Sequence, residues 1–106
     1  NHGGRQLDGS RAPFDQLEAI VDEVGGKIEI IVDGGIRRGT HVLKALSLGA
    51  TACSFGKGFL FALSAGGQKG VEMILQRMKE ELRRDMILLG KKNIADLSKD
   101  NIAFRD

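Results

Sequence analysis

The sequence predicts an α/β fold, namely the C-terminal portion of a (β/α)8 TIM barrel that is incomplete alone. Its elements follow the order loop, helix, strand, helix, strand, helix, helix. Short β-branched runs that alternate with amphipathic helices indicate parallel strands joined by right-handed crossovers. Two parallel strands cannot make a sheet with both faces covered, so the segment needs partner strands. A closed barrel takes about 250 residues, and this 106-residue chain corresponds to its last third.

The composition is that of a globular protein, with 42% hydrophobic and 28% charged residues. The net charge of +2 is too small to argue for nucleic acid or an acidic membrane surface. Five phenylalanines without tyrosine or tryptophan provide no platform for stacking bases. No apolar run approaches the roughly 20 residues that cross a bilayer. We therefore expect a globular domain without a nucleic-acid partner.

The first part of the chain predicts a loop, a helix and a strand. Residues 1–12 have no apolar period and form the loop. Pro13 suits a first helical position, with Ser10 as the candidate cap. Two glycines end the helix, and the β-branched run over 27–32 predicts a strand. The apolar face of the helix consists of Phe14, Leu17, Ile20, Val21 and Val24.

The whole segment is organised around Val32 to Thr40, which reads VDGGIRRGT and leads into a helix over about residues 40–48. Its glycines, Gly34, Gly35 and Gly39, let backbone amides approach a ligand. Those amides, the positive helix N-terminus and two arginines favour an anion, and phosphate fits best. The alternative is an ordinary glycine-rich turn with solvated arginines.

A second glycine turn, residues 56–58, follows a strand predicted over 51–55. A short buried helix is expected over 59–63, and two glycines separate it from a long helix over about 68–89. Both glycine turns lie at carboxyl ends of strands, and a phosphate site built by the last two loops recurs in barrels. An open doubly wound sheet is the alternative, although no GxGxxG is present.

His2 and Arg5 form a second candidate site in the first loop. A histidine exchanges protons near neutral pH, and an arginine offers a two-pronged donor to a carboxylate. The alternative is a solvated surface pair. His41 is expected to be a surface residue without a partner, and Cys53 a buried structural thiol. No spacing of histidines and cysteines suits a metal.

Three segments resemble the FMN-dependent 2-hydroxy acid oxidases and dehydrogenases, which include glycolate oxidase and the flavin-linked L-lactate and mandelate dehydrogenases. They read NHGGRQLDG over 1–9, VDGGIRRGT over 32–40 and VLKALSLGA over 42–50. The resemblance runs from residue 1 to about Leu97, and its first segment is the most specific. It implies one barrel domain, over 1–106 as far as this chain extends, with FMN at its carboxyl mouth.

The resemblance also implies the reaction, which is FMN-dependent oxidation of a small L-2-hydroxy acid to the 2-oxo acid. His2 matches the catalytic base of the family, and Arg5 matches the residue that binds the substrate carboxylate. His2 and Arg5 are therefore the expected substrate-binding residues. Two alternatives remain open: another FMN barrel oxidoreductase or isomerase with a different substrate, and a phosphate-binding half-barrel without catalysis.

The same resemblance implies which residues contact the cofactor. Asp33 matches a contact to the ribityl hydroxyls, and Arg37 matches a contact to the phosphate. Gly56 and Lys57 match a second phosphate-binding turn. Glycine followed by arginine is usual there, so Lys57 keeps the charge but loses the fork. The remaining expected contacts run along the cofactor chain and are Gly34, Gly35 and Ile36.

The resemblance places the other active-site residues, including tyrosines, on earlier strands, and this chain contains no tyrosine. We therefore expect the remaining barrel strands to come from another chain or from a nicked N-terminal part. The resemblance further implies a homo-oligomer, with a tetramer as the expected form.

Overall fold

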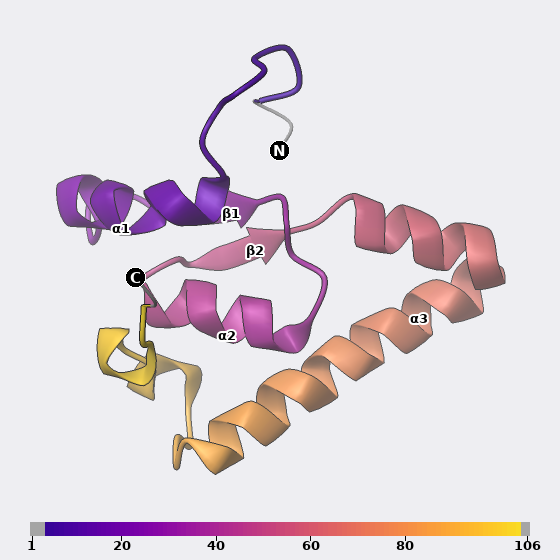
Figure 1. Cartoon of the computed structure of the whole chain (residues 1–106). Coiled ribbons are helices and arrows are strands. Elements are labelled where there is room, and N and C mark those ends of the chain that lie inside the picture. The colour runs from indigo at the N-terminus through magenta and orange to yellow at the C-terminus, as the bar shows by residue number, and fades with distance from the viewer. Residues whose placement is uncertain (1–3, 105–106) are drawn as a thin grey trace.

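The computed structural model describes residues 4–104, and Figure 1 shows a two-stranded parallel sheet with helices packed against it. The predicted alternation of helices and strands is confirmed. Two short 3-10 turns, η1 (Ile94–Asp96) and η2 (Lys99–Asn101), follow the last helix. In chain order the helices and strands are α1 (Pro13–Val24), β1 (Ile31–Asp33), α2 (Gly39–Ser47), β2 (Ala52–Ser54) and α3 (Lys57–Leu88).

The sheet has one covered face and one bare face. β1 and β2 run parallel, with Val32 opposite Cys53 and Ile31 opposite Ala52. Successive side chains of a strand point to opposite faces. Val32 is buried, whereas Ile31 is 63% exposed. Among residues 4–104, the helices therefore cover only the face to which Val32 belongs.

The first strand starts later than the sequence predicts. The prediction of a strand from residue 27 is wrong, because β1 begins at Ile31. The amide of Ile30 donates to the side-chain Oγ1 of Thr51 at 3.0 Å. A side chain therefore takes the place of the backbone acceptor that a regular ladder would use. The second strand, by contrast, falls inside its predicted range.

The core lies between the covered face of the sheet and the three helices. Leu17 of α1 and Leu48 after α2 are fully buried, and each contributes about 1.5–3 kcal/mol. The prediction that Pro13 starts α1 is confirmed, but Ala12 and not Ser10 is the N-cap residue. The buried cluster consists of Leu17, Ile30, Val32, Ile36, Ala45, Leu48, Ala50 and Met78.

Helix α3 is bent between its two segments, as the sequence predicts. Gly66 has φ −149° and ψ 15°, and Gly67 has φ 57° and ψ −144°, so neither is helical. In Figure 1 the first segment leads away from the sheet, and the second returns past the start of α2.

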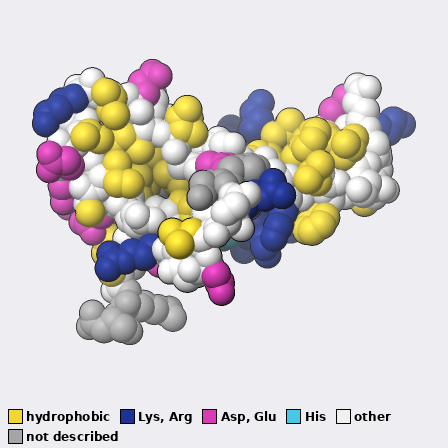
Figure 2. Space-filling view, turned by 90° about the horizontal axis from the view of Figure 1, so that it is seen from above, with side chains coloured by type: hydrophobic (Ala, Val, Ile, Leu, Met, Phe, Trp, Pro, Cys, Tyr) yellow, Lys and Arg dark blue, Asp and Glu magenta, His cyan; other side chains and the backbone are white. Residues whose placement is uncertain are grey.

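The prediction that the first segment of α3 is buried is wrong. Phe59 is 41% and Phe61 is 68% exposed. Figure 2 shows a hydrophobic patch on the right of the view, on the side where Figure 1 places the start of α3. Among the described residues, α3 packs mainly against α2, and this contact involves the second segment of α3.

Candidate functional site

The two glycine turns meet at the carboxyl end of the sheet. Asp33 ends β1 directly beside Ser54, which ends β2. The turns that follow these residues enclose a pocket of about 190 Å³. The structure thus brings together every residue that the family resemblance implies as a cofactor contact. The pocket is lined by Asp33, Gly34, Gly35, Ile36, Arg37, Phe55, Gly56 and Lys57.

The backbone of the first turn requires glycine. Gly34 has φ 99° and Gly35 has φ 74°, and side chains rarely allow this left-handed region. A Cβ added at Gly35 would meet no atom within 4 Å, so the space above this backbone is open. The side chain of Ile36 packs in the buried core and so attaches the turn to the rest of the fold. The turn therefore presents bare backbone to the pocket.

The second turn leads directly into a helix. Gly56 is the N-cap of α3 and Lys57 is its first residue. The first amides of a helix lack partners within the helix, and its N-terminus carries a partial positive charge. A Cβ added at Gly58 would lie 3.0 Å from the Phe55 ring, so the turn is tightly packed. The start of α3 thus supplies the positive helix end at this pocket.

Two cationic side chains lie at the pocket. Arg37 and Lys57 are both exposed, and neither forms an ion pair within residues 4–104. The amide of Arg37 donates to Nδ1 of His41 at 3.3 Å. The prediction that His41 has no partner is therefore wrong. His41 is half-buried and supports the backbone of the first turn.

The start of α2 lies against α3 and does not line the pocket. Glu81 of α3 accepts a hydrogen bond from the amide of Gly39 at 2.9 Å. The sequence assigns Gly39 to close approach by a ligand, and this assignment is wrong. A Cβ there would overlap the carbonyl oxygen of Met78 and lie 2.6 Å from the amide of Leu82. Gly39 instead permits close contact between α2 and α3.

The side chain of Arg38 is also bound to Glu81. Its Nε and Nη2 atoms lie 3.3 and 3.2 Å from Oε1 of Glu81. Arg77, one turn earlier on α3, lies 3.6 Å from the same oxygen. Hydrogen bonding from Arg38 is the main cause that lowers the pKa of Glu81 below its usual value of 4.5, against the opposing effect of burial. The carboxylate is therefore charged at neutral pH.

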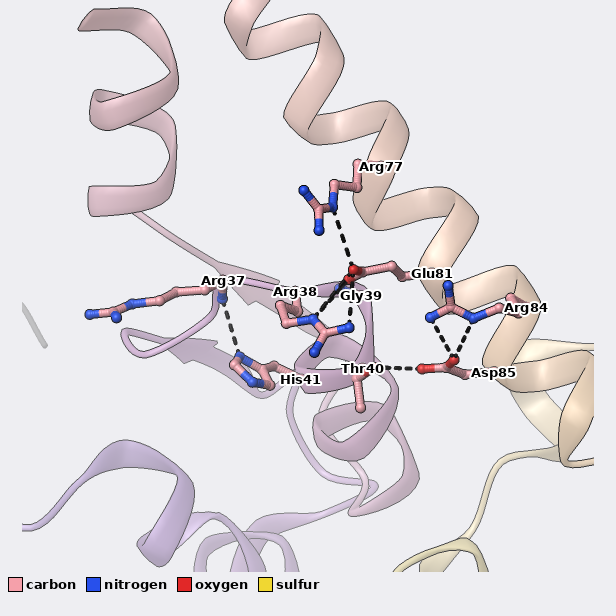
Figure 3. Close-up of polar contacts among 9 residues, drawn as sticks. All are labelled: Arg37, Arg38, Gly39, Thr40, His41, Arg77, Glu81, Arg84 and Asp85. Atoms are coloured by element: carbon pink, nitrogen blue, oxygen red, sulfur yellow. Dashed lines mark hydrogen bonds and ion pairs between the residues drawn. The ribbon is translucent and has the colours of Figure 1, made fainter. Parts of the chain in front are cut away.

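A second carboxylate of α3, that of Asp85, binds Thr40, the residue of α2 that follows Gly39. Thr40 Oγ1 donates to Oδ2 of Asp85 at 2.6 Å, and Arg84 lies 3.1 Å from Oδ1 of Asp85. The hydrogen bond from Thr40 is the main cause that lowers the pKa of Asp85. Figure 3 shows both carboxylates of α3 turned toward the start of α2. Glu81 and Asp85 therefore clamp residues 38–40.

This clamp is not among the features predicted from the sequence. The available signal was that Glu81 and Asp85 are four positions apart and stand beside Met78, Leu82 and Met86, which belong to the apolar stripe of the helix. Residues at that spacing share a helix face. Acidic residues beside a buried stripe need a cation or an amide as partner.

The proposed substrate residues lie in the N-terminal loop. His2 falls outside the described residues. Arg5 is exposed and lies in a turn that the amide of Leu7 closes on the carbonyl of Gly4 at 3.2 Å. Gly4 lines a larger hollow of about 640 Å³ that shares Asp33 with the small pocket. The loop thus reaches the first glycine turn, but Arg5 does not line the small pocket.

Other chemistry has little support in the described part of the chain. Cys53 is partly buried against the core, and burial raises its thiol pKa, which favours a structural role. Within residues 4–104, no cluster of three or more His, Cys, Asp or Glu side chains could hold a metal ion. No helix in this range is long and apolar enough to cross a membrane.

Comparisons with known proteins point to one family. A family model described as FMN-dependent dehydrogenase matches residues 1–104. The L-lactate dehydrogenase of Vibrio cholerae is 47% identical over 105 residues, which cover 99% of this chain and 28% of that protein. The human 2-hydroxyacid oxidase 1 is 48% identical over 99 residues, which cover 93% of this chain and 27% of that protein.

The same relationship is seen in a solved structure. The recombinant flavin-binding domain of baker's yeast flavocytochrome b2 superimposes with a TM-score of 0.86 at 41% identity. This match covers 100% of the chain and 31% of that structure. The chain therefore spans between about a quarter and a third of the length of the relatives it matches.

Proposed function

The chain belongs to the FMN-dependent dehydrogenase family, and from this premise we propose that the protein oxidises a small L-2-hydroxy acid to the 2-oxo acid with FMN. Relatives at 47–48% identity are named for lactate or for 2-hydroxy acids, which supports this substrate class. The observation that carries the proposal is the single pocket that joins the two glycine turns. It unites the residues through which the family resemblance implies cofactor binding.

The pocket suits the phosphate end of FMN. Its volume of about 190 Å³ is below the roughly 300–1,000 Å³ of a whole ligand site, so it would hold only part of the cofactor. Arg37, Lys57 and the start of α3 would bind the phosphate. Asp33 would accept hydrogen bonds from the ribityl hydroxyls. Gly34 and Gly35 would let the cofactor chain lie against backbone.

We assign the substrate to the N-terminal loop. The guanidinium of Arg5 would bind the carboxylate and orient the α-carbon, which lowers the entropic barrier. The imidazole of His2 would accept a proton from the substrate. FMN supplies the redox chemistry when bound, by taking up two electrons. The protein contributes the position of the substrate and the transfer of the proton.

The proposal includes a complete (β/α)8 barrel. The bare face of the sheet, with Ile31 63% exposed, would face the inside of the barrel. The remaining strands would come from another chain or from a nicked N-terminal part. We further propose a homo-oligomer, with a tetramer as the expected form.

The test is reduction of the flavin by candidate substrates. The purified complete protein should be yellow, and anaerobic addition of L-lactate, glycolate or L-mandelate should bleach the flavin absorbance. A yellow protein that no 2-hydroxy acid bleaches would favour another FMN enzyme on the same barrel. A colourless protein that does not bind added FMN would favour a half-barrel without catalysis.

A further inference from the structure

The first glycine turn carries two adjacent arginines that the structure places in different surroundings. Arg37 lines the small pocket. Arg38 is bound to Glu81 on α3. We propose that Glu81 is a positioning residue that holds Arg38 and reserves Arg37 for the phosphate of the cofactor. This inference rests on the proposed phosphate-binding role of the pocket.

Arg38 is held firmly by Glu81. Two nitrogens of Arg38 face one carboxylate, at 3.3 and 3.2 Å from Oε1 of Glu81, and Glu81 is only 5% exposed. Charge-assisted contacts with two donors fix direction as well as distance. Release of Arg38 would leave a buried carboxylate with fewer partners, which is costly.

Glu81 of α3 also binds the backbone at the start of α2. Its Oε2 accepts the amide of Gly39 at 2.9 Å. This amide would otherwise be free to bind an anion, because the first amides of a helix have no partner within it. The carboxylate of Glu81 therefore serves as the anion at this helix end. The start of α3 at Lys57 is the helix end that lines the pocket.

Arg37 points in another direction from Arg38. Its amide is held by Nδ1 of His41 at 3.3 Å, while its side chain extends away from Glu81 in Figure 3. The backbone on either side is fixed, by β1 before the turn and by the clamp on residues 38–40 after it. Arg37 is thus directed to the pocket, and Arg38 is withheld from it.

The experiment compares the affinity of the complete apoprotein for FMN and for riboflavin, which lacks the phosphate. Quenching of flavin fluorescence gives both dissociation constants. The Kd for riboflavin divided by the Kd for FMN reports how strongly the protein recognises the phosphate. Arg37→Ala should lower this ratio roughly 10-fold or more, as expected for loss of a charged hydrogen bond. Arg38→Ala should change it less than about threefold, although it removes the same charge.

The decisive variant is Glu81→Gln, which keeps an acceptor for Gly39 but releases the charge of Arg38. In a protein that carries Glu81→Gln, Arg38 is free to reach toward the phosphate. The fall in the ratio caused by Arg37→Ala should therefore be at least about threefold smaller there than in the native protein. A purely structural role of Glu81 would leave the effect of Arg37→Ala unchanged. That result would overturn the proposal.

The remaining outcomes separate this inference from the proposed function. If the native protein binds FMN no better than riboflavin, the phosphate site itself is wrong, and the inference falls with it. If FMN is strongly preferred but Arg38→Ala lowers the ratio as much as Arg37→Ala, only the role of Glu81 is refuted. This second comparison does not need Glu81→Gln to fold.

Discussion

Thr40 and Asp85 are joined by a hydrogen bond of 2.6 Å across 45 positions of sequence. The hydroxyl belongs to the first turn of α2 and the carboxylate to the last part of α3. A hydrogen bond to a charged acceptor in a partly buried place is worth more than a neutral one. This contact therefore ties the last part of α3 to the helix that follows the first glycine turn.

Replacement of Thr40 by Val should destabilise the complete protein by about 1–2 kcal/mol, because Asp85 then loses its main hydrogen-bond donor. Urea denaturation measures this loss. Ser64→Ala, at an exposed hydroxyl of α3, is the control and should stay within about 0.5 kcal/mol. Equal stability of both variants would show that the contact does not form in solution.

Replacement of Gly39 by Ala should destabilise the protein by about 2–4 kcal/mol, because the added methyl group would overlap the backbone of Met78. Thermal unfolding measures the change. Gly66→Ala is the matched control, since a Cβ there meets no atom within 4 Å. A larger loss for Gly66→Ala than for Gly39→Ala would contradict the close contact between α2 and α3.

The clamp should make the protein sensitive to acid. The pKa of Glu81 lies below its usual 4.5 and that of Asp85 below its usual 3.8, so the unfolded chain binds more protons at these groups. Their contribution to stability is complete above the unfolded values and is lost as the pH falls through the folded ones. The melting temperature should fall from pH 5 to pH 3 less steeply in Glu81→Gln and Asp85→Asn. Identical slopes would argue against a charged clamp.

Lys57→Arg should strengthen FMN binding several-fold, because a guanidinium can bind two phosphate oxygens at once. Lys57→Ala should weaken it by roughly 10-fold, since the positive charge at the start of α3 is lost. Fluorescence titration with FMN measures both effects. Riboflavin is the control ligand, and its affinity should change little. Parallel changes for both flavins would place Lys57 away from the phosphate.

His2→Gln should lower the rate of flavin reduction by roughly 100-fold or more while FMN stays bound, because the variant lacks the proposed base. Stopped-flow absorbance under anaerobic conditions measures the rate, and the visible spectrum checks the FMN content. Arg5→Lys should instead raise the KM for the substrate, since the two-pronged contact is lost. A His2→Gln variant with the native reduction rate would remove His2 from the mechanism.

The order of elements was predictable because it depends on local patterns. Pro13 and the glycines mark helix ends by their own backbone preferences. The meeting of Arg37 and Lys57 at one pocket also followed from sequence, since adjacent parallel strands end on the same edge. Predicting these features requires only the local pattern of apolar residues and the rule that adjacent parallel strands have their carboxyl ends at the same edge of the sheet.

The errors had two causes: partners that lie far apart in the chain, and local contacts that leave no pattern in the sequence. Gly39 looks like a ligand contact until Glu81, 42 positions later, is found on its amide. Phe61 looks like a core residue because hydrophobicity alone says nothing about what covers it, and it is 68% exposed. The partner of His41 is four positions away, but a ring nitrogen that accepts a backbone amide leaves no pattern in sequence.

The bend at Gly67 sets the direction in which the side chains of Glu81 and Asp85 point from the second segment of α3. A straight helix of 32 residues would measure about 48 Å, which exceeds the 40 Å extent of the chain, so the bend lets α3 double back. Each residue of a helix turns its successor by about 100°. One residue gained or lost between Gly67 and Glu81 would thus swing both carboxylates off α2. The number of residues between Gly67 and Glu81 should therefore matter more than their identity, and insertions or deletions there should be poorly tolerated.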